Sequence, residues 1–234
     1  MKKIALFFLL FMIFSCGSDD NDLVETYEER ATTVLNKSPE TNPLEDSSLF
    51  FSNLSYGSAE RNTYDVFLPK DGAPIGVVLF FHGGSFLFND KTDTYEAPFD
   101  DIFKNLLSQK VAIVNANYSY LTSPNSEGVI TSLSDGTLLL NYIRSIASSM
   151  DINANKIILV GASSGAGIAL WNGLQAEHNA GVIGVVAIET QSTYNLYDWE
   201  SLFMDLSIDI IAQSSTEFQM LFSLFYGGEV PTQE

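Results

Sequence analysis

Short apolar runs alternate with longer amphipathic segments over most of this 234-residue chain. Four of the runs are almost entirely apolar, as expected of strands buried on both faces of a parallel sheet. They are residues 75–81, 111–116, 157–160 and 182–188. Segments with helical spacing of apolar residues are found at 100–110, at 133–150 and from 163 to about 180. Strands that alternate with helices predict an α/β domain with right-handed crossovers.

Two more strands are predicted upstream, over residues 50–56 and 62–68, with a glycine-containing turn between them. Near the other end of the chain the pattern becomes looser. Two apolar, helix-like pieces remain there, around residues 201–211 and 216–225. Because the chain is too short for two sizeable domains, we expect one α/β domain that spans residues 49–234.

The first fifteen residues (1–15) are predicted to be a signal peptide and not part of the fold. Lys2 and Lys3 precede eleven apolar residues, a run too short to span a bilayer. Cys16, the only cysteine, follows almost at once, so it cannot form a disulfide within the chain. Its position resembles a bacterial lipobox, in which Cys16 becomes the lipidated N-terminus. An ordinary cleaved secretion signal is the alternative.

The residues that follow Cys16 indicate the cellular location of the protein. The acidic stretch 18–22 resembles the segment after the cysteine in surface-exported lipoproteins of the Bacteroidota. The resemblance implies the bacterial cell envelope, at the outer membrane, with the lipid as the only membrane contact. Residues 16–48 are polar and weakly periodic, so we expect a flexible tether, with room for a short helix around 23–35.

Composition and charge argue against several classes of protein and of binding partner. A hydrophobic content of 46% excludes a disordered chain. A formal net charge of −18 argues against nucleic acid as a partner, because its phosphates would be repelled. Two histidines and one cysteine offer no cluster of ligands, so no metal is predicted. The sequence indicates no oligomeric state.

A strand, a tight turn and a helix meet around Ser163. The apolar strand at 157–160 runs into Gly-Ala-Ser-Ser-Gly at 161–165, which fits the pattern G-x-S-x-G of a nucleophile elbow. In such a turn the serine has a strained backbone, and side chains two positions before and after it would collide. Ser163 has glycines at both positions whereas Ser164 has alanines, so Ser163 is the predicted nucleophile. A glycine-rich turn that only packs tightly or holds a phosphate is the alternative.

A second glycine-rich motif, His82-Gly83-Gly84, follows the predicted strand 75–81. A tetrahedral acyl intermediate needs backbone N–H donors directed at its oxyanion, and glycines allow the backbone to come that close. In a fold with a nucleophile elbow, the loop after such a strand is where these donors are expected. Taken alone, the motif is equally compatible with a structural glycine turn.

Together the two motifs resemble the carboxylesterase and hormone-sensitive-lipase branch of the α/β-hydrolase fold. Residues 115–121 add a variant of that branch's Asp-Tyr-Arg-Leu stretch, with Tyr118 as the matching residue. The resemblance covers roughly residues 60–200. It implies a three-layer sandwich around a mostly parallel sheet, and hydrolysis of acyl esters without a cofactor. It also implies that Ser163 is the nucleophile, that the N–H groups of Ser164, Gly83 and Gly84 form the oxyanion hole, and that His82 orients the loop.

The sequence departs from that family where the rest of the catalytic triad belongs. The family's order is Ser, then Asp or Glu, then His, and the histidine takes the proton of the serine. This chain has two histidines. His82 precedes Ser163, out of the family's order. His178 follows Ser163 on the same predicted helix, about 22 Å along the axis, so it is not expected to reach the serine. Candidate acids, without a histidine partner, are Glu189, Asp198, Asp205 and Asp209.

The predicted sheet departs from the family in the same region. Six strands are predicted, whereas the family's sheet has eight. The last two strands are therefore expected to be missing, and the chain to be truncated at its C-terminal end. Residues 182–188 would then form an apolar edge strand unless the helices after residue 200 cover it.

Three functions remain on this basis. The first is a serine hydrolase of the carboxylesterase type, which acts on a small-molecule or glycan acyl ester and is represented by an incomplete chain. The second is a non-catalytic, hydrolase-like surface lipoprotein that binds a ligand in the same pocket. The third is a secreted serine peptidase with the same elbow. Fluorophosphonate labelling of Ser163 separates the first from the second, and a panel of acyl esters and dipeptide amides separates the first from the third.

Overall fold

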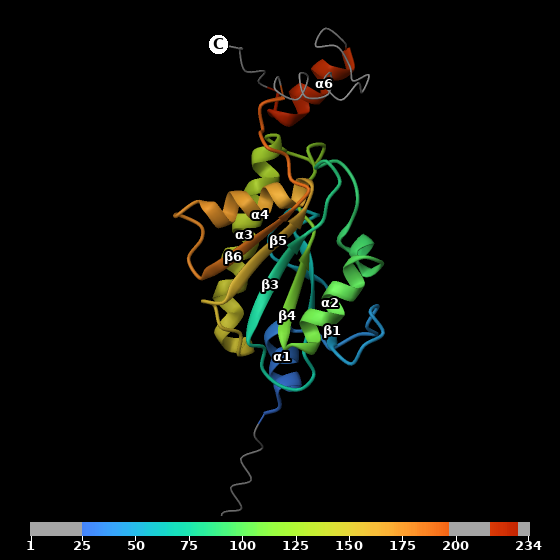
Figure 1. Ribbon diagram of the computed structural model, residues 1–234, viewed down its shortest axis with the longest axis vertical. Helices are drawn as coiled ribbons and strands as arrows, with labels where there is room; N and C mark the ends of the chain where they lie inside the picture. Colours follow the sequence, from blue (N-terminus) through green and yellow to red (C-terminus); the bar gives the residue numbers. More distant parts are fainter. Residues whose placement is uncertain (1–24, 197–215, 229–234) are drawn as a thin grey trace, which may run out of the picture.

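The computed structural model describes residues 25–196 and 216–228 (Figure 1). The predicted signal peptide with Cys16, and the helix-like piece at 201–211, lie outside these ranges. Of the helices in the described part, none is long and apolar enough to cross a membrane.

Six strands form one mixed sheet in the order β1-β2-β4-β3-β5-β6. They are β1 Leu49–Ser55, β2 Thr63–Leu68, β3 Gly76–Phe81, β4 Val111–Ala116, β5 Ile157–Ala162 and β6 Val182–Ile188. β2 is antiparallel to its neighbours β1 and β4, and the other pairs are parallel. All six predicted strands and the mostly parallel sheet are therefore confirmed. Because β3 and β5 are direct neighbours, the loops after them lie side by side.

Helices cover both faces of the sheet, so the predicted three-layer architecture is confirmed (Figure 1). Their bounds are α1 Tyr27–Leu35, α2 Phe99–Ser108, α3 Val129–Ala147, α4 Ser164–Leu174 and α6 Thr216–Phe225, with short 3-10 helices η1 Lys91–Tyr95 and η2 Ser148–Met150. α2 covers one face, where the ring centroid of Phe103 lies 5.3 Å from that of Phe80 in β3. On the other face, α1, α3 and α4 share a core with Leu79 of β3. Successive side chains of β3 point alternately into the core on one face of the sheet and the core on the other. This explains why the sequence of β3 is wholly apolar.

α4 ends at Leu174, earlier than the predicted end near residue 180. The side-chain amide of Asn179 donates to the carbonyl of Gly173 at 3.3 Å, and the Arg144 guanidinium donates to the carbonyl of His178 at 2.5 Å. The carbonyl groups at the end of a helix lack partners within the helix. Here these two side chains donate hydrogen bonds to the carbonyl of Gly173, in the last turn, and to that of His178, beyond the helix. His178 therefore lies in the turn after α4 and not on the helix, which corrects the prediction.

The folded part of the chain begins well before β1. α1 has a capping box, in which Thr26 and Glu29 satisfy each other's backbone N–H groups. Ala31 and Leu35 of α1 are buried in the main core, and Leu44 is buried further along. The short helix allowed for around residues 23–35 is confirmed as α1, whereas the flexible tether predicted for residues 16–48 is wrong for the described part of that stretch. A few well-placed apolar residues anchor it to the domain despite its polar composition.

β6 stands at the edge of the described sheet, and its side chains Ile183 and Val186 are 63% and 48% exposed. α6 buries apolar residues elsewhere, at the carboxyl end of the sheet. The ring of Phe225 lies 6.3 Å from that of Phe86, which belongs to the loop after β3. α6 therefore does not supply the cover that this apolar edge would need, and the other helix-like piece, at 201–211, lies outside the described residues.

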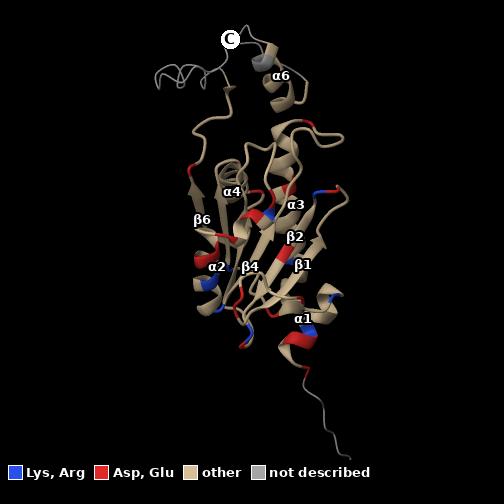
Figure 2. Ribbon diagram, turned by 90° about the vertical axis from the view of Figure 1, so that its right-hand side faces the viewer, with Lys and Arg blue, Asp and Glu red and all other residues tan. Residues whose placement is uncertain are grey.

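Charged residues lie almost entirely outside the six strands (Figure 2). The exception is Asp65 of β2, whose buried carboxylate lies 3.4 Å from Lys91 Nζ and accepts from the N–H of Asn53 at 2.6 Å. Burial raises the pKa of Asp65, while the Tyr95 hydroxyl and the Lys91 ammonium act in the opposite direction. This buried pair fastens η1, and with it the end of the loop after β3, to the sheet.

Candidate active site

Ser163 stands at the junction between β5 and α4, at the carboxyl end of the sheet. Its φ of 50° and ψ of −117° belong to a region that residues other than glycine rarely occupy. Two hydrogen bonds hold it there. Its N–H donates to the carbonyl of Ile188 at 2.8 Å, and its own carbonyl accepts from the N–H of Ala166 at 3.0 Å. The backbone strain predicted for this serine is therefore present.

The glycines two positions before and after Ser163 are required by close backbone contacts. A Cβ atom on Gly161 would lie 2.1 Å from the carbonyl oxygen of Gly165. A Cβ atom on Gly165 would lie 2.2 Å from the carbonyl oxygen of Phe81, at the end of β3. The predicted need for glycine is confirmed, and the second contact shows how closely the elbow packs on the strand that precedes the other motif.

The His82-Gly83-Gly84 loop lies directly against the elbow. A Cβ atom on Gly83 would be 3.4 Å from the Cβ of Ser163, and Gly84 has a φ of +122°, which favours glycine. Among the described residues, none accepts a hydrogen bond from the backbone N–H of Gly83, Gly84 or Ser164. Three donors without an acceptor among the described residues and a strained serine therefore lie together at the carboxyl end of the sheet.

His82 is buried, and its ring contacts hold the loop that it begins. The ring stacks on Tyr118 at 4.6 Å between centroids, and its Nδ1 lies 2.6 Å from the carbonyl oxygen of Gly83. The hydroxyl of Tyr118 donates to the carbonyl of His82 at 2.9 Å and lies 3.0 Å from Ser164 Oγ. Tyr118 thus connects the two motifs. An orienting role for His82 fits these contacts and stays a prediction.

Burial lowers the pKa of His82 below its usual value. In the unfolded chain the ring takes up a proton near pH 6.5, whereas in the folded protein it does so at lower pH. Between the two pKa values the unfolded state binds more protons, so the free energy of unfolding is expected to fall as the pH falls below about 6.5. Urea denaturation at about pH 7.5 and about pH 5.5 measures this fall, which is expected to be smaller for His82→Asn. An equal fall in both proteins would contradict the shifted pKa.

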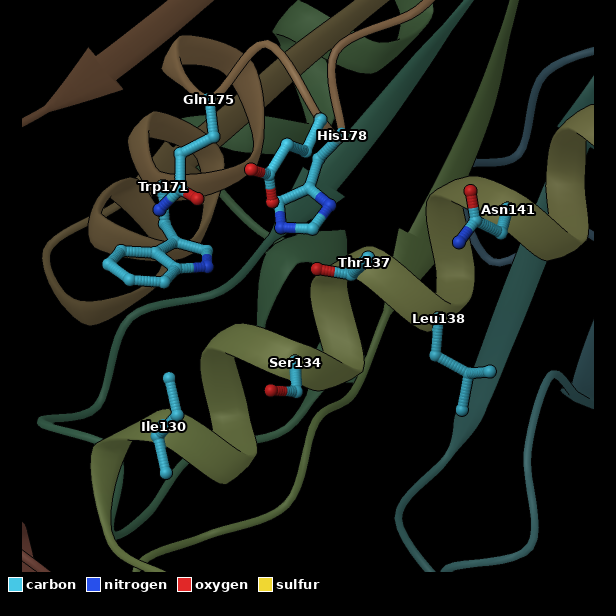
Figure 3. A pocket seen from close by; sticks show the side chains of 9 residues that line it. Ile130, Ser134, Thr137, Leu138, Asn141, Trp171, Gln175 and His178 are labelled. Carbon is cyan, nitrogen blue, oxygen red and sulfur yellow. The ribbon is translucent and has the colours of Figure 1, made fainter.

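His178 is remote from this site. It lines a groove of about 550 Å³ between α3 and α4, together with Trp171 and Thr137 (Figure 3). Ser163 precedes the first residue of α4 and His178 follows the last. The helix therefore separates them by about 16 Å along its axis. The prediction that His178 does not reach Ser163 agrees with this placement, although the helix is shorter than expected.

The candidate acids do not complete the site. Glu189 is exposed immediately after β6. Asp198, Asp205 and Asp209 lie outside the described residues. In the part of the chain that the structure describes, no group of three or more His, Cys, Asp or Glu side chains could hold a metal ion. The described site thus provides a serine and hydrogen-bond donors. The ring nitrogens of His82 face Arg61 and the carbonyl of Gly83 and not Ser163, and His178 lies beyond the other end of α4.

One residue at this site was indicated by no sequence pattern. Arg61, in the turn between β1 and β2, extends its guanidinium over the ring of Tyr120, at 3.7 Å from the centroid. Its Nε donates to the carbonyl of Tyr118 at 2.9 Å, and its Nη2 donates to the carbonyl of Asn89 at 3.2 Å. These two partners lie 57 and 28 positions away in the chain, so only the folded structure reveals the arginine.

A model of the BD-FAE family matches residues 64–216, which is more than half of the chain and includes both motifs. The chain belongs to the BD-FAE family. This is an esterase family of the α/β-hydrolase fold, so the resemblance inferred from the two motifs is confirmed for fold and family. Among curated proteins, none matches the chain.

Solved structures of other proteins are similar to this chain to different degrees. A candidate thioesterase from Silicibacter sp. tm1040 is 20% identical, with 85% of this chain and 68% of that one covered and a TM-score of 0.52. Esterase B from Lactobacillus rhamnosis is 18% identical over 61% of this chain and 47% of that one, with a TM-score of 0.48. A truncated carbohydrate esterase from gut microbiota is 22% identical over 56% and 45%, with a TM-score of 0.46. The chain therefore spans less than half the length of the last two proteins.

Proposed function

We propose that this chain carries the nucleophile and the oxyanion hole of a serine hydrolase of the carboxylesterase type. Ser163 attacks the acyl carbon of an ester, and the N–H groups of Gly83, Gly84 and Ser164 hold the oxyanion that forms. One observation carries the proposal: a strained serine and three unpaired backbone donors lie together at the ends of two adjacent strands. Membership of an esterase family supports the same chemistry.

The proposal needs a general base, because a serine hydroxyl is a poor nucleophile at neutral pH. His82 faces the carbonyl of Gly83 and His178 lies beyond α4, and the chain has no third histidine. We infer that a base from outside this sequence completes the triad. The intact mass of the gene product, isolated from its own cells, tests this inference, and a mass clearly above that of the lipidated chain is expected. A mass equal to that of residues 16–234 plus lipid would favour the non-catalytic binding lipoprotein.

The proposed substrates are acyl esters of small molecules or of glycans, such as acetylated or feruloylated glycans. With the protein isolated from its own cells, a fluorophosphonate is expected to label Ser163, and acyl esters are expected to be hydrolysed in preference to dipeptide amides. Labelling together with cleavage of the amides, but not of the esters, would favour a serine peptidase. The absence of labelling would contradict a hydrolase and favour a binding lipoprotein.

We also propose that Cys16 carries a lipid that anchors the protein in the bacterial cell envelope, at the outer membrane and exposed at the surface. The basic pair, the apolar run and the cysteine at the start of the sequence support this. The N-terminal peptide of the mature protein is expected to begin at Cys16 and to carry the mass of a lipid, which Cys16→Ser removes. A mature N-terminus at another residue, without lipid, would indicate an ordinary secretion signal.

A further inference from the structure

Arg61 is at the centre of the contacts that hold the loop after β3. Its side chain is only 19% exposed, and its Nη2 lies 3.4 Å from His82 Nε2. The same guanidinium donates to the carbonyls of Tyr118 and Asn89, and its Nη1 lies 3.5 Å from the Asp90 carboxylate. Arg61 therefore joins three segments, which are the turn after β1, the loop after β3 and the loop after β4.

The two ring nitrogens of His82 face groups of opposite kind. A guanidinium only donates hydrogen bonds, so Nε2, which faces Arg61, is the acceptor. A carbonyl oxygen only accepts, so Nδ1, at 2.6 Å from the oxygen of Gly83, carries the proton. In the other neutral tautomer, the Nε2–H would face the N–H groups of Arg61. The lone pair of Nδ1 would then face the lone pairs of the Gly83 carbonyl oxygen. A doubly protonated ring would place a second positive charge beside the guanidinium.

The carbonyl of Gly83 and the N–H of Gly84 belong to one peptide group. A hydrogen bond accepted by the carbonyl oxygen polarises that group and makes its N–H a stronger donor. This N–H is one of the three unpaired donors beside Ser163. A continuous series of contacts thus runs from the Arg61 guanidinium, through the His82 ring, to a peptide group of the oxyanion hole.

We propose that Arg61 is a positioning residue that holds His82 in its neutral Nδ1–H tautomer and so orients and polarises the Gly83–Gly84 peptide. Its effect on catalysis rests on the proposed function, whereas the tautomer of His82 does not. The position of Arg61 in a turn far from both motifs explains why neither motif indicated it.

The charges around His82 agree with a neutral ring. Burial lowers the pKa of His82, and the charge of Arg61 acts in the same direction. The hydrogen bond to Gly83 and the carboxylates of Asp90 and Asp93 oppose this change but do not reverse it. The ring is therefore unprotonated on one nitrogen at neutral pH, as the tautomer assignment requires.

NMR of the 234-residue chain with ¹⁵N-labelled histidine tests the tautomer, because this chain has two histidines that contribute ring signals. His178→Asn identifies the signals of His82. Cross-peaks between the ring protons and the two nitrogens are expected to show protonation at Nδ1 at neutral pH. Arg61→Met is expected to populate the Nε2–H tautomer. Arg144→Met, which removes the guanidinium that contacts the carbonyl of His178, is the matched control and is expected to leave the His82 signals unchanged.

An ester hydrolysis assay on the protein isolated from its own cells tests the catalytic part. Arg61→Met is expected to lower kcat about tenfold and to leave KM within about twofold, because the polarised N–H acts mainly in the transition state. An unchanged kcat alongside an altered tautomer would overturn this part. Arg144→Met is expected to match the wild type in both constants.

Two NMR results would overturn the assignment of Arg61. One is a wild-type His82 ring protonated on Nε2 or on both nitrogens at neutral pH, and the other is an unchanged tautomer in Arg61→Met. The wild-type spectrum alone can contradict the proposal, so the test does not depend on whether Arg61→Met folds. A wild-type protein without ester turnover would contradict the proposed function and leave the tautomer to be decided by NMR.

Discussion

Replacing Ser163 by alanine is expected to abolish ester hydrolysis, with kcat reduced by at least about 10⁴-fold. The Ser163 hydroxyl is the group that forms the covalent bond to the substrate, so the oxyanion hole alone can bind the ester but cannot form the acyl-enzyme. Initial rates with a chromogenic acyl ester measure the loss in protein isolated from its own cells. Fluorophosphonate labelling is expected to disappear in the same variant.

Two other serines provide the controls. Ser164→Ala keeps the backbone N–H assigned to the oxyanion hole and loses only the Oγ contact with Tyr118, so kcat is expected to fall by less than about tenfold. Ser145→Ala changes an exposed position on α3 and is expected to behave as the wild type. If Ser163→Ala kept as much activity as Ser164→Ala, the assignment of the nucleophile would be wrong.

Gly165→Ala is expected to lower the free energy of unfolding by about 3 to 5 kcal/mol, or to prevent folding altogether. The added methyl group would lie 2.2 Å from the carbonyl oxygen of Phe81 and 2.4 Å from that of His82. Both are backbone atoms that are held in place, because Phe81 is the last residue of β3, a strand paired on both sides, and the carbonyl of His82 accepts from the Tyr118 hydroxyl. Urea denaturation followed by circular dichroism measures the effect.

Gly184→Ala is the matched control for this substitution. At Gly184, on β6, the nearest atom to the added methyl group would be Ile158 Cγ1 at 3.9 Å, an ordinary contact. The free energy of unfolding is expected to change by less than about 1 kcal/mol, and to rise if the reduced freedom of the unfolded chain dominates. Equal destabilisation by Gly165→Ala and Gly184→Ala would refute the close packing of the elbow on β3.

The elbow could be recognised from the sequence because its determinants are local. Gly161, Ser163 and Gly165 lie within five consecutive positions, and the strand before them and the helix after them supply the context. The end of α4 could not be predicted in the same way. It depends on a carbonyl contact from Arg144 of α3, 34 positions from its partner, and on the amide of Asn179. A helical pattern of apolar residues carries no information about either contact.

By itself, the sequence determined the order of strands and helices, the strained turn at Ser163 and the glycine-rich loop after β3. Each of these depends on residues that are close together in the chain. Only the tertiary structure decided that Gly83 lies against Ser163, that Arg61 reaches His82, and that α1 packs on the domain. The family resemblance implied the first of these and neither of the others. Such contacts join distant positions, and their strength depends on burial and geometry that exist only once the sheet and its covering helices have assembled.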